Sequence, residues 1–227
     1  MSLGKVGVIV AARMGSSRLP GKALLPLQGI PMAEFLLRRL HPLRGGTVVL
    51  ATTELPADDH VAALAARNGV PVFRGAESDL VARYVGAAKE FGFDTVARVT
   101  ADCPFVDADL VDGCIGHAAA LDRFDLATTK GRFPIGLDVE IYRAEQMALL
   151  HESCELTSAH REHLTLYFYD HPEKFDIRRI DPPLGWLATT CRFTVDTAAD
   201  YEHAQALAAR FDQPEFSAQA LLTVFAS

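Results

Sequence analysis

A loop rich in arginine, serine and glycine is the first part of the sequence with residue types suited to chemistry. It covers residues 12–22 and directly follows Gly4–Ala12, whose valines and isoleucines are typical of a buried strand. Glycine lets backbone N–H groups approach an anion closely, while the guanidinium groups of Arg13 and Arg18 and the ammonium group of Lys22 neutralise its charge. The loop therefore predicts a polyphosphate site. The alternative is a solvated surface loop with scattered charge.

The spacing of this loop excludes two common nucleotide-binding motifs. In the P-loop, fewer residues separate the first glycine from the Gly-Lys pair than the five that lie between Gly15 and Gly21 here. In addition, Ala23 follows Lys22 where the P-loop needs Ser or Thr. The dinucleotide fingerprint Gly-x-Gly-x-x-Gly is also absent. The chain is thus predicted to be neither a Walker-type NTPase nor an ordinary NAD(P) enzyme.

Two aspartates come directly after predicted strands. Asp102 follows the strand Thr95–Thr100, and Asp196 follows the strand Arg192–Thr194. If both strands end at the same edge of a sheet, the two carboxylates can meet over one ligand, and Mg²⁺ prefers one or two carboxylates together with phosphate oxygens and water. Asp102 is alternatively an ordinary turn residue. A capping role suits Asp196 less, because Thr197 already begins a capping box for the next helix.

Composition narrows the class of protein that the elements must build. The chain has 227 residues, a net charge of −7, 49% hydrophobic and 22% charged residues, an ordinary globular mix that argues against a general nucleic-acid binder. No apolar run approaches the roughly 18 residues of a membrane span, and no secretion signal is evident. The four cysteines are widely spaced without a Cys-x-x-Cys pair, which favours a reducing cytosol and a cytoplasmic protein with neither disulfides nor zinc.

The alternation of strands and helices through the first half predicts a mostly parallel sheet covered by helices on both faces. Further strands are expected at Thr47–Thr52, Val70–Phe73, Leu126–Thr129, Asp138–Tyr142 and Phe175–Ile180. Helices are expected at Pro31–Leu43, Asp58–Asn68, Glu77–Phe91, Asp107–Leu121, Arg143–Leu150, Ser158–Tyr169, Thr197–Phe211 and Pro214–Phe225. We therefore predict one α/β domain over residues 1–227, with an irregular second half and with ligands beyond the carboxyl ends of the strands.

The loop at residues 12–22 resembles the signature loop of the CMP-sugar synthetases, which include acylneuraminate and 3-deoxy-manno-octulosonate cytidylyltransferases. The resemblance continues in order through residues 72–75, 98–104, 136–140, 161–163 and 193–197. The segments Gly136–Glu140 and Arg161–His163 are similar to the spore-coat-polysaccharide branch. The resemblance implies a three-layer α/β/α nucleotidyltransferase fold, like that of the GT-A glycosyltransferases, with a mostly parallel mixed sheet.

The resemblance also implies a nucleotide site and a metal site. The implied nucleotide-binding residues are Ala12, Arg13, Gly15, Ser16, Arg18 and Lys22 in the first loop, and Ser78, Asp79 and Arg83 near the base. Arg13, Lys22 and Asp102 are the implied catalytic residues, and Asp102 and Asp196 the implied Mg²⁺ ligands, with Mn²⁺ as a substitute. Ser78 is alternatively only a helix N-cap. Cytosine as the base follows from the resemblance alone.

The implied acceptor-binding residues lie in the second half of the chain. They are Asp138 and Glu140, which face the same side of their predicted strand, and Arg161, Glu162 and His163. The two histidines around Arg161 and Glu162 lack the spacing of a metalloprotease helix, so a polar helix start is the alternative. The chain departs from the branch at Ile135, where an aspartate is usual, and at Ala101, where glycine is usual.

These inferences combine into one predicted activity. The chain is expected to be a Mg²⁺-dependent cytidylyltransferase that transfers CMP from CTP to an acidic sugar of the nonulosonic or octulosonic type. Pyrophosphate would be released, the product would serve surface polysaccharide synthesis, and the relatives imply a homodimer. The alternatives are a nucleotidyltransferase for another sugar or polyol phosphate, and a non-catalytic protein that binds sugar nucleotides. No residue stands out as a general base.

Overall fold

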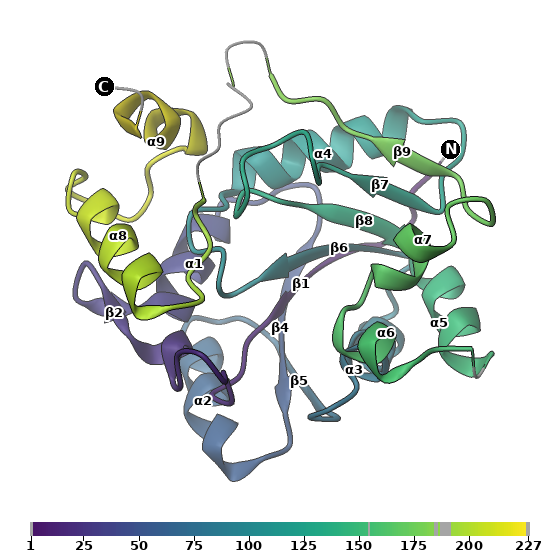
Figure 1. Cartoon of the computed structure of the whole chain (residues 1–227), viewed down its shortest axis with the longest axis horizontal. Coiled ribbons are helices and arrows are strands. Elements are labelled where there is room, and N and C mark those ends of the chain that lie inside the picture. Colours follow the sequence, from purple (N-terminus) through teal and green to yellow (C-terminus); the bar gives the residue numbers. More distant parts are fainter. Residues whose placement is uncertain (1, 154, 184–185, 187–191, 226–227) are drawn as a thin grey trace.

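A seven-stranded sheet is the centre of the computed structural model, which describes residues 2–153, 155–183, 186 and 192–225 (Figure 1). Its strands are β1 (Val6–Ala11), β4 (Thr47–Thr53), β5 (Val72–Gly75), β6 (Thr95–Thr100), β7 (Leu126–Thr128), β8 (Glu140–Arg143) and β9 (Ile177–Arg179). They lie in the order β5-β4-β1-β6-β8-β7-β9, and β8 runs antiparallel to both of its neighbours while the other pairs are parallel. The predicted mostly parallel sheet is confirmed.

Helices cover both faces of the sheet, because residues that alternate along the central strands are apolar on both sides. The helices are α1 (Met32–Leu40), α2 (Asp59–Arg67), α3 (Leu80–Phe91), α4 (Ala108–Ala120), α5 (Ala144–Glu152), α6 (Ser158–Glu162), α7 (Leu166–Asp170), α8 (Ala198–Ala208) and α9 (Ala218–Phe225). Val8 and Val10 of β1 belong to a core shared with α1 and α4, whereas Ile9 belongs to a separate core shared with α3 and α5. The three layers are therefore present (Figure 1).

The order of the strands creates a crevice next to β1. The chain goes from β1 to β4 and β5 on one side, then returns to β6 on the other side of β1. The connections after β1 and β6 therefore diverge from each other at their carboxyl ends, which is the place where open α/β sheets bind ligands. These two connections begin with the arginine-rich loop at residues 12–22 and the turn that contains Asp102.

The second half differs from the sequence prediction in three places. The expected helix Ser158–Tyr169 is two short helices, α6 and α7, since the chain turns between them and Thr165 bonds to Glu140. The expected strand Arg192–Thr194 is reduced to one bridge between Arg192 and Ile135. Strand β8 begins at Glu140 instead of Asp138, whose side chain accepts a hydrogen bond from the backbone N–H of residue 136.

A small hairpin was not predicted, because its strands contain only two residues each. Strands β2 (Pro26–Leu27) and β3 (Ile30–Pro31) are joined by Gln28 and Gly29, both with positive φ. Such a pair of left-handed residues matches the twist of a tight hairpin. The hairpin places the start of α1 beneath the arginine-rich loop, since Met32 lines the pocket described below.

Two further findings concern the length of the helices and the state of the cysteines. Across the described part of the chain, no helix is both long and apolar enough to cross a membrane. Cys103 and Cys114 are buried free thiols. Cys154 and Cys191, the other two cysteines of the sequence, lie outside the described residues.

Candidate active site

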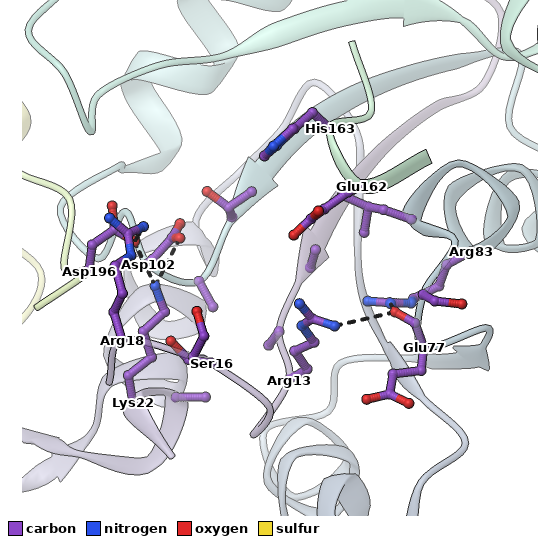
Figure 2. A pocket seen from close by; sticks show the side chains of 18 of the residues that line it. Arg13, Ser16, Arg18, Lys22, Glu77, Arg83, Asp102, Glu162, His163 and Asp196 are labelled. Atoms are coloured by element: carbon purple, nitrogen blue, oxygen red, sulfur yellow. Dashed lines mark hydrogen bonds and ion pairs between the residues drawn. The ribbon is translucent and has the colours of Figure 1, made fainter. Parts of the chain in front are cut away.

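A pocket of about 570 Å³ opens beyond the carboxyl ends of β1 and β6, on the sheet face that carries α3 and α6 (Figure 2). Its walls come from the loop after β1, the segment leading into α3, strand β6 with its following turn, helix α6, and the turn before α8. Its ionisable lining residues are Arg13, Arg18, Lys22, Glu77, Arg83, Arg98, Asp102, Glu162, His163 and Asp196. The pocket therefore carries charged groups of both signs, with apolar residues such as Met32 and Leu80 between them.

The Lys22 ammonium group holds together one end of the pocket. Its Nζ lies 3.1 Å from Asp102 Oδ2 and 3.1 Å from Asp196 Oδ1, and it donates to the Val195 carbonyl at 2.8 Å. Arg18 Nη2 lies 3.0 Å from the same oxygen of Asp196. Lys22 and Asp196 are 174 positions apart in the sequence, and two carboxylates thus converge on one cation (Figure 2).

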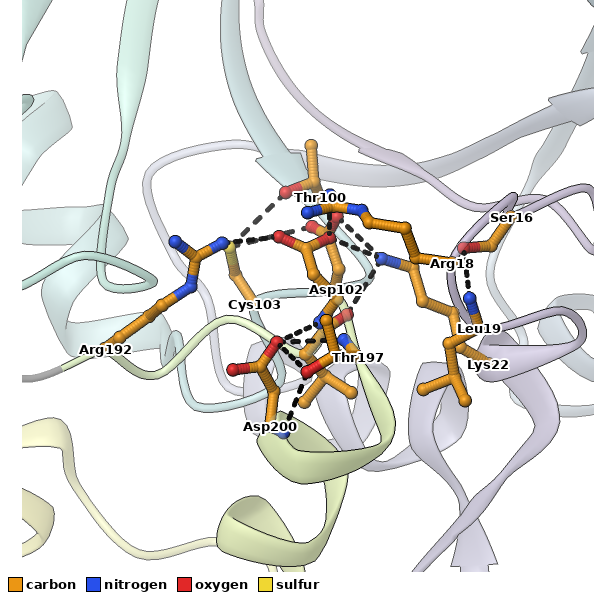
Figure 3. A network of polar contacts seen from close by, with 12 residues as sticks. Ser16, Arg18, Leu19, Lys22, Thr100, Asp102, Cys103, Arg192, Thr197 and Asp200 are labelled. Atoms are coloured by element: carbon orange, nitrogen blue, oxygen red, sulfur yellow. Dashed lines mark hydrogen bonds and ion pairs between the residues drawn. The ribbon is translucent and has the colours of Figure 1, made fainter.

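Asp196 is available for this cluster because its neighbour caps the following helix. Thr197 and Asp200 form the predicted capping box at the start of α8, in which each side chain accepts the other's backbone N–H. Figure 3 shows Thr197 and Asp200 side by side in this box. Asp196 itself is bound by Arg192, whose Nη2 lies 2.6 Å from Oδ2. The segment that leads to this turn packs closely against Gly136, whose φ is +93°. A Cβ atom at residue 136 would lie 2.5 Å from the backbone of residues 193–194.

Asp102 is a carboxylate held in its charged form. Burial disfavours the charge, but the nearby ammonium group of Lys22 and hydrogen bonds from Thr100 and Lys22 hold the pKa of Asp102 below its ordinary value. The Cys103 thiol also lies next to it, with Sγ 3.7 Å from Oδ1. This end of the pocket can therefore bind a cation or exchange Lys22 for one.

The arginine-rich loop is fastened by a buried carboxylate that lies outside the pocket lining. Asp58, which is 2% exposed, accepts a hydrogen bond from the backbone N–H of Met14 at 2.6 Å and another from Thr53 Oγ1. Within the described residues, the backbone N–H groups of Gly15 and Ser17 donate to no protein acceptor. The loop thus presents free N–H groups while its backbone is held in place, as an anion site requires.

Two arginines meet on the opposite side of the pocket. Arg13 Nη1 donates to the carbonyl of Glu77 at 3.3 Å, and Arg83 Nη2 donates to the same carbonyl at 2.9 Å (Figure 2). Arg83 also donates through Nε to the carbonyl of Ala76 and is only 2% exposed. Arg83 therefore fastens the segment that leads into α3, and Arg13 keeps more of its guanidinium group for a ligand.

The cytidylyltransferase family profile matches residues 7–221, which include every lining residue of this pocket and all of the sheet except Val6. The chain belongs to the cytidylyltransferase family. The spore coat polysaccharide biosynthesis protein SpsF of Bacillus subtilis is 32% identical to this cytidylyltransferase over 222 residues, which are 95% of this chain and 92% of SpsF. The resemblance carried by the loop at residues 12–22 is confirmed.

Solved structures support the same assignment. A cytidylyltransferase from Leptospira borgpetersenii superposes with a TM-score of 0.92 at 35% identity, covering 98% of this chain and 94% of that one. A CMP:2-keto-3-deoxy-manno-octonic acid synthetase complexed with CTP gives a TM-score of 0.70 at 19% identity, covering 91% and 99% of the two chains. The second comparison shows the fold alone. The predicted nucleotidyltransferase fold is confirmed, and the cytidylyltransferase is an enzyme that uses CTP.

The predicted base-binding residues have separate positions in this cytidylyltransferase. Ser78 is exposed and lines the pocket. Asp79 is the N-cap of α3, where its side chain accepts from the Ala82 N–H at 2.8 Å and from Arg161 Nη1 at 2.6 Å. Both contacts of the Asp79 carboxylate are thus within the protein, whereas Ser78 lines the pocket.

The predicted acceptor-binding residues are also divided. Glu162 and His163 line the pocket above the arginine-rich loop (Figure 2). Asp138, Glu140 and Arg161 do not belong to the lining. Burial raises the pKa of Asp138 despite its hydrogen bond from a backbone N–H, and its side chain remains with its own turn. Sequence reasoning grouped all of these residues by resemblance and had no means of separating them.

Arg98 lines the pocket although no prediction included it. It lies in the middle of β6, between valines and alanines, and a charged residue there needs a buried partner. That partner is Glu140, directly opposite on β8. An isolated arginine within an apolar strand was the sequence signal that could have identified it.

The ligand set at the Lys22 end fits a divalent cation. Among the described residues, no group of three or more His, Cys, Asp or Glu side chains forms a metal cluster, so the protein supplies only carboxylates in a pair. Mg²⁺ is bound in this way when a nucleotide supplies the remaining ligands through its phosphate oxygens, together with water. Asp102 and Asp196, which already share one cation, match that mode of binding.

Proposed function

We propose that this cytidylyltransferase transfers CMP from CTP to an acidic sugar of the nonulosonic or octulosonic type, with Mg²⁺ or Mn²⁺ as its metal. An oxygen of the sugar attacks the α-phosphorus of CTP, the bond from that phosphorus to the bridging oxygen breaks, and pyrophosphate leaves. The product would be a CMP-activated sugar for surface polysaccharide synthesis. The observation that carries the proposal is the convergence of Asp102, Asp196 and Lys22 beside a loop with free N–H groups.

The phosphate-binding part of the proposal rests on the loop at residues 12–22. Arg13 and Arg18 provide forked donors for phosphate oxygens, and Lys22 provides a compact charge. The free N–H groups of Gly15 and Ser17 add donors without a change in the fold. Positioning and charge neutralisation supply most of the catalysis in transfers of phosphoryl groups, so no covalent nucleophile is needed.

The metal would be held by the carboxylates of Asp102 and Asp196. When bound, it supplies neutralisation of charge on the α-phosphate and orientation of the reacting oxygens. Lys22 is tied to both carboxylates, and its four-carbon stem lets the ammonium group shift toward a phosphate while it stays near them. Arg192 keeps Asp196 oriented during that shift, because it binds the other oxygen of the carboxylate.

The first experiment measures pyrophosphate release with Mg²⁺ and each of CTP, UTP, ATP and GTP. The acceptors are 3-deoxy-manno-octulosonate, N-acetylneuraminate and a set of sugar and polyol phosphates. We expect release with CTP and a sugar acid only. Release with a phosphorylated sugar in place of the acid would overturn the acceptor class and leave the CTP-dependent transfer intact.

A second experiment tests the metal ligands by equilibrium binding. Mn²⁺ should tighten CTP binding to the wild-type protein at least tenfold and should have little effect on Asp102→Asn, since that variant loses one of two carboxylates. Asp109→Asn is the matched control, because Asp109 lies on the exposed surface of α4. An equal response to Mn²⁺ in Asp102→Asn would remove the metal from the proposal.

A further inference from the structure

Arg98 reaches the pocket from a central strand of the sheet, whereas Arg13 and Arg18 reach it from a loop. Residues 98 and 100 both point to the pocket face of β6, because side chains alternate along a strand. In the pairing of β6 with β8, Arg98 lies directly opposite Glu140, and Arg98 Nη1 is 2.5 Å from Glu140 Oε2. The Arg98 side chain keeps 27% of its surface exposed, whereas that of Glu140 keeps 3%.

Glu140 is fully occupied within the protein. Thr165 Oγ1 lies 2.9 Å from both carboxylate oxygens, and the Tyr169 hydroxyl donates to Oε1 at 2.6 Å. Burial opposes its charge, but Arg98 and these hydroxyl groups hold the pKa of Glu140 below its ordinary value. Its remaining role is to orient Arg98, since Glu140 lies outside the described lining of the pocket.

Arg98 has donors that the protein does not use. A guanidinium group carries five N–H groups, and the contact with Glu140 is made through Nη1. Nε of Arg98 is buried without a hydrogen-bond partner among the described residues. An arginine fixed by one nitrogen and open to a pocket by another edge is suited to a planar, charged acceptor such as a carboxylate.

The rest of the pocket decides which ligand reaches Arg98. Under the proposed function, the triphosphate would occupy the loop at residues 12–22, and the base would lie against the segment leading into α3. In another part of the lining, β6 contributes Arg98 and Thr100, α6 contributes Ser158 and Glu162, and His163 follows directly after α6. Thr165, two residues after His163, binds the same Glu140 that orients Arg98, so this part of the pocket is built as one unit.

We propose that Arg98, oriented by the Glu140 carboxylate, binds the carboxylate of the acceptor sugar and sets the preference for acidic acceptors. This inference rests on the proposed function for the nature of the acceptor. It assigns Arg98 as a specificity residue in direct contact with the substrate, and Glu140 as a positioning residue that acts through Arg98. When no substrate is bound, the charges of Arg98 and Glu140 neutralise each other.

The test measures binding by calorimetry in the presence of CTP, with Ca²⁺ in place of Mg²⁺ to slow turnover. The probes are 3-deoxy-manno-octulosonate, N-acetylneuraminate and the methyl ester of each acid. The variants are Arg98→Met, Arg98→Lys and the double variant Arg98→Met with Glu140→Gln, which leaves no unpaired buried charge. Arg143→Met is the matched control, because Arg143 lies on the same pair of strands, binds Thr95 Oγ1, and does not line the pocket.

The wild-type protein should bind at least one acid at least tenfold more tightly than its ester. Arg98→Met and the double variant should weaken binding of the acid about 50-fold, while ester binding and CTP binding stay within threefold. Arg98→Lys should lose about tenfold, because lysine keeps the charge without the fork. Arg143→Met should bind the acid as the wild-type protein does.

Three results of the binding measurements would overturn the inference. They are an equal loss of acid and ester binding in the Arg98 variants, a parallel loss of CTP binding, and a wild-type protein that binds neither acid. Pyrophosphate release from CTP with a neutral acceptor would refute the role of Arg98 and keep the transfer reaction. Sugar-acid binding that depends on Arg98 without any pyrophosphate release would refute the proposed function and keep the role of Arg98.

Discussion

The two ends of the pocket hold their charges in different ways. We call the end that contains Arg18, Lys22, Asp102 and Asp196 the phosphate end, after its proposed ligand. There, Lys22 has a long side chain that lies between Asp102 and Asp196, and these partners belong to loops and turns. At the acceptor end, defined by Arg98, Glu162 and His163, the arginine comes from a central strand and its carboxylate partner is buried under two hydroxyl groups. The Lys22 ammonium group can therefore leave its carboxylate partners for another ion, whereas Arg98 stays paired with Glu140.

This difference fits what each end has to recognise. In the proposed reaction, a triphosphate with its metal would arrive, react and leave as pyrophosphate, so its ligands would have to release and re-form contacts in each cycle. A sugar is selected by the placement of a few fixed donors, and a rigid group loses less entropy when it binds. We therefore expect changes at the phosphate end to affect the rate, and changes at the acceptor end to affect the choice of sugar.

Lys22→Met is expected to have the largest effect among the variants considered. The methionine keeps the length of the stem but leaves Asp102 and Asp196 without their shared cation, and the triphosphate loses a positive charge. We expect kcat to fall by about 10²–10³-fold, as for the loss of one preorganised donor in other enzymes. Steady-state pyrophosphate release checks the prediction.

Lys5→Met is the control for this variant. Lys5 precedes β1, and its Nζ donates to the carbonyl of Phe91 at the edge of the sheet opposite the pocket, so its loss removes a charge without a change in the pocket. A kcat for Lys22→Met within threefold of the control would show that the phosphate end does not depend on an exchangeable lysine.

Glu140→Gln tests the acceptor end and should affect activity less than Lys22→Met does. Glutamine keeps the shape but leaves Arg98 without a charged partner, so we expect the KM for the sugar acid to rise about tenfold at nearly constant kcat. The free energy of unfolding at pH 7 should fall by about 2 kcal/mol, less than for a fully buried pair because Arg98 is partly exposed. Kinetics and urea unfolding check the two values.

The pH dependence of this loss has a definite sign. The pKa of Glu140 lies below its ordinary value of 4.5 in the folded protein, so the pair stabilises the fold at pH values above 4.5. That contribution disappears as the pH falls through the folded pKa. The difference in unfolding free energy between wild type and Glu140→Gln should therefore shrink below pH 4.5, and a constant difference down to pH 3 would refute the ion-pair origin.

The same comparison explains which parts the sequence revealed. Candidate groups at the phosphate end could be identified because its carboxylates follow predicted strands, and because its cations lie in one continuous loop, where glycine spacing and cations have a direct chemical meaning. Lys22, Asp102 and Asp196 were all predicted, and Thr197 was expected to cap α8. The regular first half of the fold was predictable for a related reason, since its strands and helices have clear apolar periods.

The acceptor end depends on contacts between distant parts of the chain. Arg98 pairs with Glu140 only because β8 inserts antiparallel beside β6, and the sequence contains no local signal for that order of strands. The break between α6 and α7 is also tertiary, because Thr165 turns toward the buried Glu140. A helical period continues across that break in the sequence, which is why one helix was predicted there.

Asp58→Asn is expected to have a smaller effect that belongs to the phosphate end. The new amide side chain would donate through its NH₂ group to Thr53 Oγ1 and offer a neutral oxygen in place of a charged carboxylate to the Met14 N–H, so the attachment of the loop would be weaker. We expect the Kd for CTP to rise about fivefold, with sugar-acid binding unchanged. Asp112→Asn, which also loses a carboxylate that accepts from loop N–H groups, should leave both unchanged.

Tyr169→Phe is expected to have the smallest effect and to separate orientation from charge at the acceptor end. It removes one of the hydroxyl groups that fix Glu140, along with a contact to Thr128 Oγ1, while the ring keeps its place beside Lys130. We expect about 1 kcal/mol less stability. The Kd for the sugar acid should rise about threefold, because Arg98 keeps its charged partner but loses part of the fixed position of that partner.

Tyr201→Phe provides the comparison for this small change. The Tyr201 hydroxyl donates to the Pro26 carbonyl at 2.6 Å, away from the acceptor end, so its loss should also lower stability without a change in acid binding. Calorimetry with the acid and its methyl ester distinguishes the two variants. If Tyr169→Phe binds the acid as tightly as Tyr201→Phe does, the hydroxyl does not help to orient Arg98, and the charge of Glu140 alone holds the arginine.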